Sequence, residues 1–171
     1  MGKKLLRPLA DLGTVALLLF LLSPSSRAAE LKKLNLDSAG ALGTTIRSDT
    51  RIRSEGSGSI RISTLWPTTI SVGEVSGLDV EHAVLVYRGK VRSENLEGQA
   101  FLEMWCYVGG GQYFSRGLNS FVSGSSDWKT LETPFFLQAG QKAEKVILNV
   151  IINGRGTIWI DDVTLSAEPL N

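Results

Sequence analysis

The chain has 171 residues, of which 43% are apolar, so one domain with its own hydrophobic core is expected. It carries 18 basic and 17 acidic residues, and this near-neutral balance argues against nucleic acid, whose backbone demands a basic footprint. The single cysteine, Cys106, excludes a disulfide framework within the chain.

Residues 1–28 have the three parts of a secretory signal peptide. A basic start with Lys3, Lys4 and Arg7 precedes an apolar run that is densest over 15–22, and Ser26-Arg27-Ala28 provides small residues for cleavage after Ala28. We therefore expect an N-terminal signal helix that is removed from the mature protein. The alternative is an uncleaved membrane anchor, but the apolar run is well short of the ~20 residues that a spanning helix needs.

Cleavage at this site would leave a mature domain that is secreted or periplasmic. Removal of residues 1–28 takes away four basic residues and one acidic residue, which leaves 14 basic and 16 acidic residues and a formal charge of −2. A near-neutral domain lacks the basic surface that docks on anionic lipid. We expect no membrane attachment after cleavage.

The mature chain begins with a short segment, 29–43, that is expected to form either a leader or the first strand. The domain proper is expected to span 44–166, and a C-terminal tail spans 167–171. Within the domain, Arg51-Ile52-Arg53 and Ile60-Arg61-Ile62 are predicted to pair as one hairpin around the glycine- and serine-rich turn between them.

Further strand candidates follow at short spacing along the chain. Alternating or apolar segments predict strands over 68–75, 83–93, 99–108, 112–116, 128–137, 145–152 and 157–165. Turn residues separate them, most clearly at 95–98, 109–111, 123–127, 138–144 and 153–156. No segment after the signal peptide keeps a helical period of apolar residues, so we predict an all-β antiparallel sandwich.

The final strand carries the most informative motif of the chain. The segment Gly154-Arg155-Gly156-Thr157-Ile158-Trp159-Ile160-Asp161-Asp162-Val163 resembles the last strand of domains in the galactose-binding-like and carbohydrate-binding-module superfamily. The segments 101–107 and 128–136 resemble other strands of the same domains. The resemblance implies an antiparallel jelly-roll β-sandwich with a role in binding carbohydrate.

The strand predicted over 99–108 separates two faces. Alternation places Leu102, Met104, Cys106 and Val108 on one side and Phe101, Glu103, Trp105 and Tyr107 on the other. The first set is apolar, so Cys106 is expected to be a buried, inert thiol. The second set would look outward, where a flat ring can stack on a sugar while polar groups bind its hydroxyls.

We therefore name Trp105, Tyr107 and Glu103 as ligand-binding candidates. Arg116, just after the triglycine loop, and Trp128, at the start of a later strand, complete the set. The alternative for the aromatic residues is packing in the core or at the rim, because most tryptophans in a sandwich of this size serve that purpose.

The residues that usually carry catalysis are scarce in this chain. The only histidine, His82, lies in a loop-like segment and is expected to be solvated or structural rather than the base of a catalytic triad. One histidine and one cysteine do not supply the ligands of a zinc site. Two carboxylates, Glu103 with Asp161 or Asp162, could serve a small glycoside hydrolase. We predict that the protein is not an enzyme and keep this hydrolase as the weakest alternative.

Asp161 and Asp162 are adjacent acids in an apolar strand, and their burial is costly unless a cation, a basic side chain or a bend resolves it. The resemblance implies a structural calcium ion held by an acid of this pair with ligands from the N-terminal part of the sandwich. Asp37 and Asp49 are the further acidic candidates. The alternative is a pair of acids satisfied by backbone amides and arginine.

These observations predict a secreted, non-catalytic module that binds a polysaccharide or another glycan through an aromatic-bearing sheet face or a loop rim. The alternative is a structural or protein-interaction module of the cell envelope, which would offer the same face or an exposed edge strand to an envelope protein.

Overall fold

The computed structural model describes residues 28–34 and 46–170, and these residues form strands joined by turns and short connections. The strands are β1 (Ala29–Leu34), β2 (Ile46–Asp49), β3 (Ser59–Thr64), β4 (Thr68–Ser76), β5 (Ala83–Val108), β6 (Gly111–Leu137) and β7 (Ala143–Pro169). Every pair among them is antiparallel, which confirms the predicted fold class. The predicted signal helix and Asp37 lie outside the described residues. Within the described ranges, no helix has the length and apolar character to cross a bilayer.

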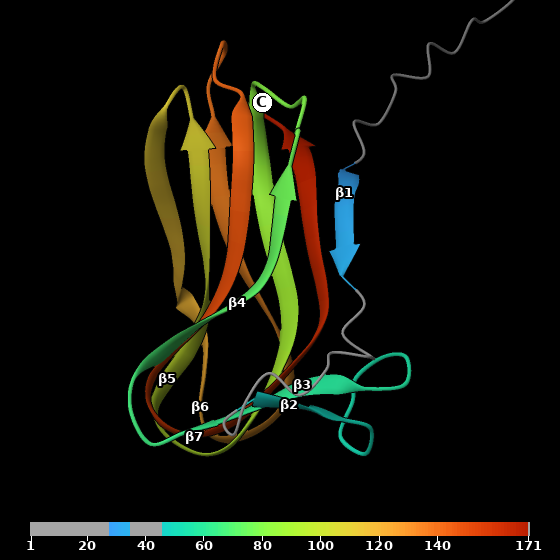
Figure 1. Ribbon diagram of the computed structural model, residues 1–171, viewed down its shortest axis with the longest axis vertical. Helices are drawn as coiled ribbons and strands as arrows, with labels where there is room; N and C mark the ends of the chain where they lie inside the picture. Colours follow the sequence, from blue (N-terminus) through green and yellow to red (C-terminus); the bar gives the residue numbers. More distant parts are fainter. Residues whose placement is uncertain (1–27, 35–45, 171) are drawn as a thin grey trace, which may run out of the picture.

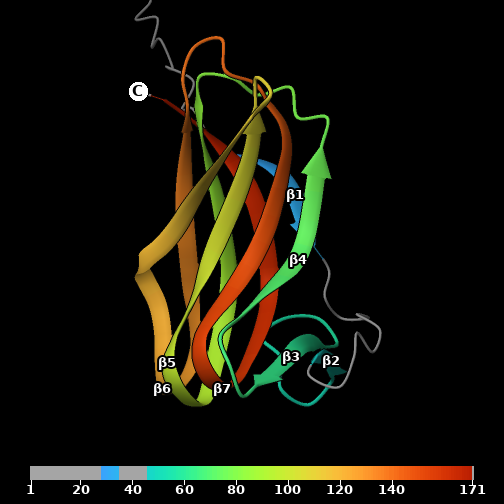
Figure 2. The same cartoon turned by 60° about the vertical axis from the view of Figure 1, so that its left-hand side comes forward.

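The three longest strands each run through both layers of the sandwich. β5 has 26 residues, β6 and β7 have 27 each, and all three bend at the end of the molecule that carries β2 and β3 (Figure 1). We call the layer formed by β4, 143–153 of β7, 99–108 of β5 and 111–122 of β6 the front sheet. The back sheet consists of the other halves of these long strands together with β1, β3 and β2 (Figure 2).

The bend replaces three turns that the sequence predicted. Residues 95–98, 123–127 and 153–156 stay within β5, β6 and β7, so the predicted interruptions at these places are wrong. Gly98 has a φ of 104°, and a Cβ there would clash with the carbonyl oxygen of Asn153 on the neighbouring strand. Register shifts between β5 and β6 let the pair curve while the ladder continues. The turn residues bend these strands rather than end them.

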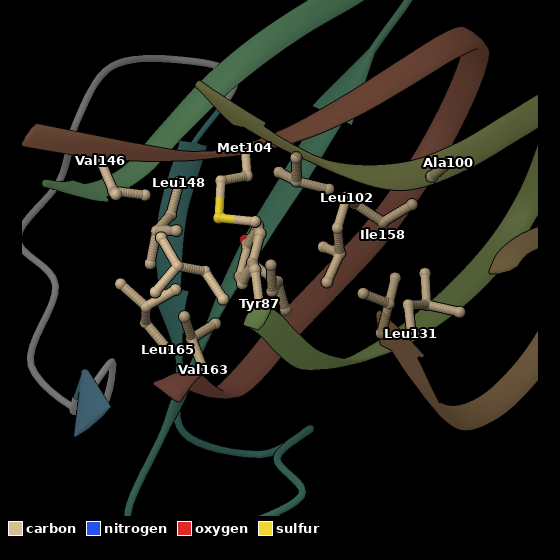
Figure 3. Packing of buried hydrophobic residues seen from close by; sticks show 14 of the residues in the cluster. Tyr87, Ala100, Leu102, Met104, Leu131, Val146, Leu148, Ile158, Val163 and Leu165 are labelled. Carbon is tan, nitrogen blue, oxygen red and sulfur yellow. The ribbon is translucent and has the colours of Figure 1, made fainter. Parts of the chain in front are cut away.

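The core lies between the two sheets and is filled by alternate residues of the long strands. On the front sheet the inward residues include Leu102, Met104 and Cys106, as the alternation predicted. The same cluster contains Tyr87 and Leu165 of the back sheet (Figure 3). Burial raises the pKa of the Cys106 thiol to about 12, so this residue stays protonated and inert at neutral pH.

The N-terminal hairpin has a different register from the predicted one. β3 pairs with β2, and Asp49 lies opposite Ser59, so the prediction that 51–53 forms the partner strand is wrong. Oδ1 of Asp49 accepts hydrogen bonds from the N–H groups of Arg51 at 2.9 Å and Ile52 at 3.1 Å. This local turn takes the chain out of the ladder directly after β2.

Candidate functional site

The outward surface of the front sheet, which we call the front face, brings together side chains from three strands. The register places them in rows: Arg116, Glu103 and Asn149 in the first, Phe114, Trp105 and Ile147 in the second, and Gln112, Tyr107 and Lys145 in the third. Alternate residues of a strand share a face. The apolar neighbours on β5 therefore fill the core, and the aromatic and polar residues remain on the front face.

Glu103 is the centre of the first row and is only 2% exposed. Its Oε1 accepts hydrogen bonds from Nε1 of Trp105 at 2.8 Å and from Nδ2 of Asn149 at 3.0 Å. Its Oε2 accepts one from Nε of Arg116 at 2.6 Å. One buried carboxylate thus fixes an indole, an amide and a guanidinium from β5, β7 and β6.

The ionisation of Glu103 follows from these bonds. Burial alone would raise the pKa of this carboxyl, but hydrogen bonds from Arg116, Asn149 and Trp105 outweigh burial and hold the pKa below its ordinary value of 4.5. The side chain is therefore ionised at neutral pH, and both of its oxygens are engaged. It is suited to orienting its neighbours and has no proton to donate.

The aromatic rings of the front face contact one another or a neighbouring cation, and they remain partly exposed to solvent. The ring centroids of Trp105 and Phe114 lie 5.1 Å apart with an interplanar angle of 45°. The guanidinium of Arg116 lies 4.7 Å from the Phe114 centroid, and Nζ of Lys145 lies 4.3 Å from that of Tyr107. Phe114 is 52% exposed, and Trp105 and Tyr107 are half-buried. The rings are held in place while part of each stays accessible.

A hollow of about 370 Å³ adjoins the first row on the side of the bend. Phe101 and Ile151, which lie opposite each other on β5 and β7, supply apolar lining, and Arg116 supplies a charged group. Thr69 of β4 and Asn153 add polar groups at its edge. Polar and apolar groups both line this hollow, and it continues the front face toward the bend.

Four of the five predicted ligand candidates lie together on the front face: Trp105, Tyr107, Glu103 and Arg116. Trp128 does not join them. It lies in the half of β6 that belongs to the back sheet, next to Lys129, which pairs with Val91. Residues 123–127, which are predicted to form a loop, are a bend within β6, and this bend separates Trp128 from the other four.

Phe114 and Asn149 belong to the site and were missed as candidates. Asn149 is the one polar residue in the apolar run 146–152, and a polar side chain in such a run signals a specific partner. Phe114 lies opposite Trp105 because of the register set by the turn at Gly109 and Gly110. Neither strand alone reveals that pairing.

The acidic pair of β7 is satisfied by protein groups. Oδ2 of Asp161 accepts from the N–H groups of Ser54 at 2.7 Å and Glu55 at 2.9 Å, and Oδ1 accepts from that of Asp162 at 2.7 Å. Asp162 has a φ of 49°, which breaks the alternation of the strand. Its carboxylate lies 3.1 Å from Nζ of Lys90 and 3.4 Å from Nζ of Lys33.

These surroundings do not fit a calcium ion. Backbone N–H groups direct their hydrogens at Asp161, and two ammonium groups neutralise Asp162, whereas calcium needs a shell of free oxygens. In the part of the chain that the structure describes, no group of three or more His, Cys, Asp or Glu side chains could hold a metal. The calcium ion implied by the resemblance gains no support from these residues, and the alternative, satisfaction by backbone amides, is observed for Asp161.

Comparison with known proteins by sequence gives no matching family model and no matching curated protein. Comparison by structure gives several solved structures with the same fold. The CBM22-1 xylan-binding domain of Paenibacillus barcinonensis Xyn10C aligns with a TM-score of 0.58 and 11% identity, covering 85% of this chain and 98% of that one. A second xylan-binding domain of family 22 aligns at 0.55 with 10% identity, covering 84% of this chain and 97% of that domain.

A structure described as family 16 carbohydrate-binding module 2 has the same fold at a lower similarity. It aligns with a TM-score of 0.52 and 7% identity, and the alignment covers 73% of this chain and 87% of that module. The chain therefore has the jelly-roll fold of carbohydrate-binding modules, which confirms the fold that the resemblance of its strands predicted.

Proposed function

We propose that the protein is a secreted, non-catalytic module that binds a polysaccharide on its front face. The observation that carries this proposal is the anchored ring of Trp105. Glu103 holds its indole N–H at 2.8 Å, while Phe114 and Arg116 lie beside it. An aromatic side chain that is fixed by a buried partner and left partly exposed to water is well suited to contact a ligand.

The chemistry of the front face suits a sugar. Each sugar ring has an apolar C–H face and an edge of hydroxyl groups, so it needs a flat apolar surface next to hydrogen-bonding groups. Trp105 and Phe114 offer the flat surface. Arg116 uses Nε for Glu103, and its other N–H groups are donors that a hydroxyl can accept from. Because these groups are already ordered, binding does not have to order them.

The state of Glu103 argues against the glycoside hydrolase alternative. A glycosidase needs a carboxylic acid with a raised pKa to protonate the leaving oxygen, and a second carboxylate on the other side of the bond. Glu103 has a lowered pKa, and the acidic pair on β7 is bound to amides and lysines in the back sheet. His82 is exposed in a connection between strands. The proposal is therefore a binding module.

Xylan is the first ligand to test, because two of the solved structures with this fold are described as xylan-binding domains. The test is a polysaccharide array that carries xylan with other plant, fungal and bacterial glycans. We expect the protein to bind at least one glycan, and Trp105→Ala to weaken that binding by about tenfold or more. Circular dichroism checks that the variant stays folded.

The matched control is Phe136→Ala on the back-sheet half of β6. Phe136 is 56% exposed, so the change removes an exposed aromatic ring that lies outside the front face. Binding equal to that of the unchanged protein is expected. A folded protein that binds none of the glycans would contradict the proposal and would favour the envelope-interaction alternative, which partner pull-downs from envelope extracts would then examine.

Secretion rests on the signal pattern in the sequence and has its own test. Mass spectrometry of the protein recovered from the producing cells should give a mass that begins at Ala29. A protein that retains Met1 would contradict cleavage and favour the membrane anchor.

A further inference from the structure

The connection between β3 and β4 presents two large apolar side chains to solvent. This connection lies at the bent end of the sandwich beside the long strands (Figure 2), and its residues Leu65 and Trp66 are each 70% exposed. Single exposed apolar residues are common, but an exposed tryptophan with an apolar neighbour next to a hollow marks an interaction site. Neither residue contributes to the front face described above.

The backbone that carries Trp66 is held rigidly. The Oγ1 atom of Thr64, which is buried, donates to the carbonyl oxygen of Trp66 at 2.7 Å and accepts from its N–H group at 3.3 Å. Pro67 follows, and a proline restricts the residue before it to extended conformations. The ring is thus displayed by an ordered turn, which lowers the entropy lost when a ligand stacks on it.

A hollow of about 390 Å³ lies beside the Trp66 ring and has polar lining. Arg155 and Glu97 form a bidentate ion pair there. Nε and Nη2 of Arg155 each lie 2.9 Å from a carboxylate oxygen of Glu97. The hydroxyls of Ser63 and Thr157 lie 2.9 Å apart on the same wall. A flat ring next to several donors and acceptors repeats the composition of the front face.

The two hollows are neighbours along the same two segments of chain. The first is lined by Pro67–Thr69 and Ile151–Asn153, and the second by Ser63–Trp66 and Arg155–Thr157. The Trp105 row and the Phe101 row are four residues apart on β5, about 13 Å at the usual rise of a strand. A ligand that touched Trp105, the first hollow and Trp66 would therefore be longer than one sugar ring.

We propose that Trp66 is a second aromatic platform for the polysaccharide, so that the binding surface runs from the front face past Arg116 and around the bend to the Glu97–Arg155 pair. This inference rests on the proposed function and extends the binding surface to a second aromatic side chain. The ligand is a long glycan chain, of which the front face holds one part and Trp66 another.

The test is a calorimetric titration with ladders of xylo-, cello- and galacto-oligosaccharides from two to eight sugar units. For the sugar that binds, Trp66→Ala should leave the Kd of the shortest binding members unchanged and weaken the longest by about five- to tenfold. Trp66→Phe should retain most of the affinity for the longest. Trp105→Ala should weaken every length, and Phe136→Ala none.

Each other outcome overturns a defined part of this account. If Trp66→Ala binds all lengths as the unchanged protein does, Trp66 is no platform, and the proposed function still stands. If Trp66→Ala weakens short and long members equally, the ligand is a single short unit rather than a long chain. If the unchanged protein binds neither these ladders nor any glycan of the array, the proposed function fails together with this inference. If it binds another glycan of the array, the titration uses the ladder of that glycan.

Discussion

The two outer surfaces of the sandwich use tryptophan in opposite ways. On the back sheet, Trp159 is 2% exposed, because the guanidinium carbons of Arg61 and Arg92 lie 5.5 Å and 6.0 Å from its ring centroid. Its indole N–H donates to Oδ2 of Asp49 at 2.9 Å. On the front face, Trp105 has the same kind of carboxylate anchor, but its ring stays partly exposed. An anchored indole can therefore serve packing or binding, and the exposure of the ring distinguishes the two.

Charged groups follow the same division between the surfaces. On the back sheet, Arg88 bridges Glu132 at 2.8 Å and Glu168 at 3.1 Å, and Lys90 lies 3.1 Å from Asp162. On the front face, Arg116 is tied to a buried carboxylate through one nitrogen and is otherwise free to meet a ligand. The arginine and lysine side chains of the back surface are paired with acids across its strands, whereas Arg116 of the front face has N–H groups that a ligand can reach.

Replacement of Trp159 or Trp105 by alanine should give the largest difference between the two surfaces in unfolding free energy. Trp159→Ala is expected to lower the free energy of unfolding by about 3–5 kcal/mol, because it removes a buried aromatic side chain. Trp105→Ala should cost clearly less stability and should weaken glycan binding by about tenfold or more. Chemical denaturation of both variants measures this difference. Equal destabilisation would mean that Trp105 is a core residue and would remove the basis of the comparison.

Removal of the anchor on the front face should have the next largest effect. Glu103→Ala leaves the indole N–H of Trp105 and the amide of Asn149 without their acceptor, and we expect a loss of about 2–3 kcal/mol in unfolding free energy. Glu103→Gln keeps an acceptor and should lose less. Both variants should bind glycan more weakly, because the Trp105 ring is no longer fixed. Unchanged affinity in Glu103→Ala would show that the anchor does not position the ring.

Lowering the pH should reduce the stability that the ionised Glu103 carboxylate contributes. The pKa of Glu103 is lower in the folded protein than its ordinary value of 4.5, so its stabilising contribution is complete above that value and is lost as the pH falls through the folded pKa. The unfolding free energy of the unchanged protein should therefore fall more steeply below about pH 5 than that of Glu103→Gln. Parallel pH profiles would contradict the ionised state assigned to Glu103.

The smallest effects are expected where lysines meet Asp162. Burial would raise the pKa of Asp162, but a hydrogen bond with Glu55 and the charges of Lys90 and Lys33 outweigh burial, and the pKa is lowered. Lys90→Met should cost less than about 1 kcal/mol, because the pair is partly exposed. A chelator should leave the melting temperature unchanged, and added calcium should not raise it. A rise of several degrees with calcium would restore the metal site that the resemblance implied.

The front face could be predicted from sequence, because it depends on one regular alternation in β5. The pattern of Phe101, Glu103, Trp105 and Tyr107 assigns these residues to one surface without any knowledge of neighbouring strands. Local turn chemistry was less informative. Gly98 and the glycines at 154 and 156 are turn residues by type, but they lie at a bend in continuous strands, and this bend places Trp128 in the back sheet.

The partners of several side chains could not be predicted, because they come from segments that are distant in the sequence. Asp161 is satisfied by amides of Ser54 and Glu55, more than a hundred positions away along the chain. The cover of Trp159 comes from Arg61 on β3 and Arg92 on β5, and only the register of three strands brings them together. Alternation within one strand predicts which face a residue lies on. Its partners depend on the register between strands, which the pattern within one strand does not determine.

The most direct test of the account is NMR spectroscopy of the four tryptophan indole N–H signals during titration with a glycan that the array identifies. Each signal reports on a different place: Trp105 on the front face, Trp66 at the bend, and Trp128 and Trp159 in the back sheet. Tryptophan-to-phenylalanine variants assign the signals. The account predicts that the Trp105 signal shifts on binding while those of Trp128 and Trp159 stay in place. A shift confined to the back-sheet tryptophans would contradict it.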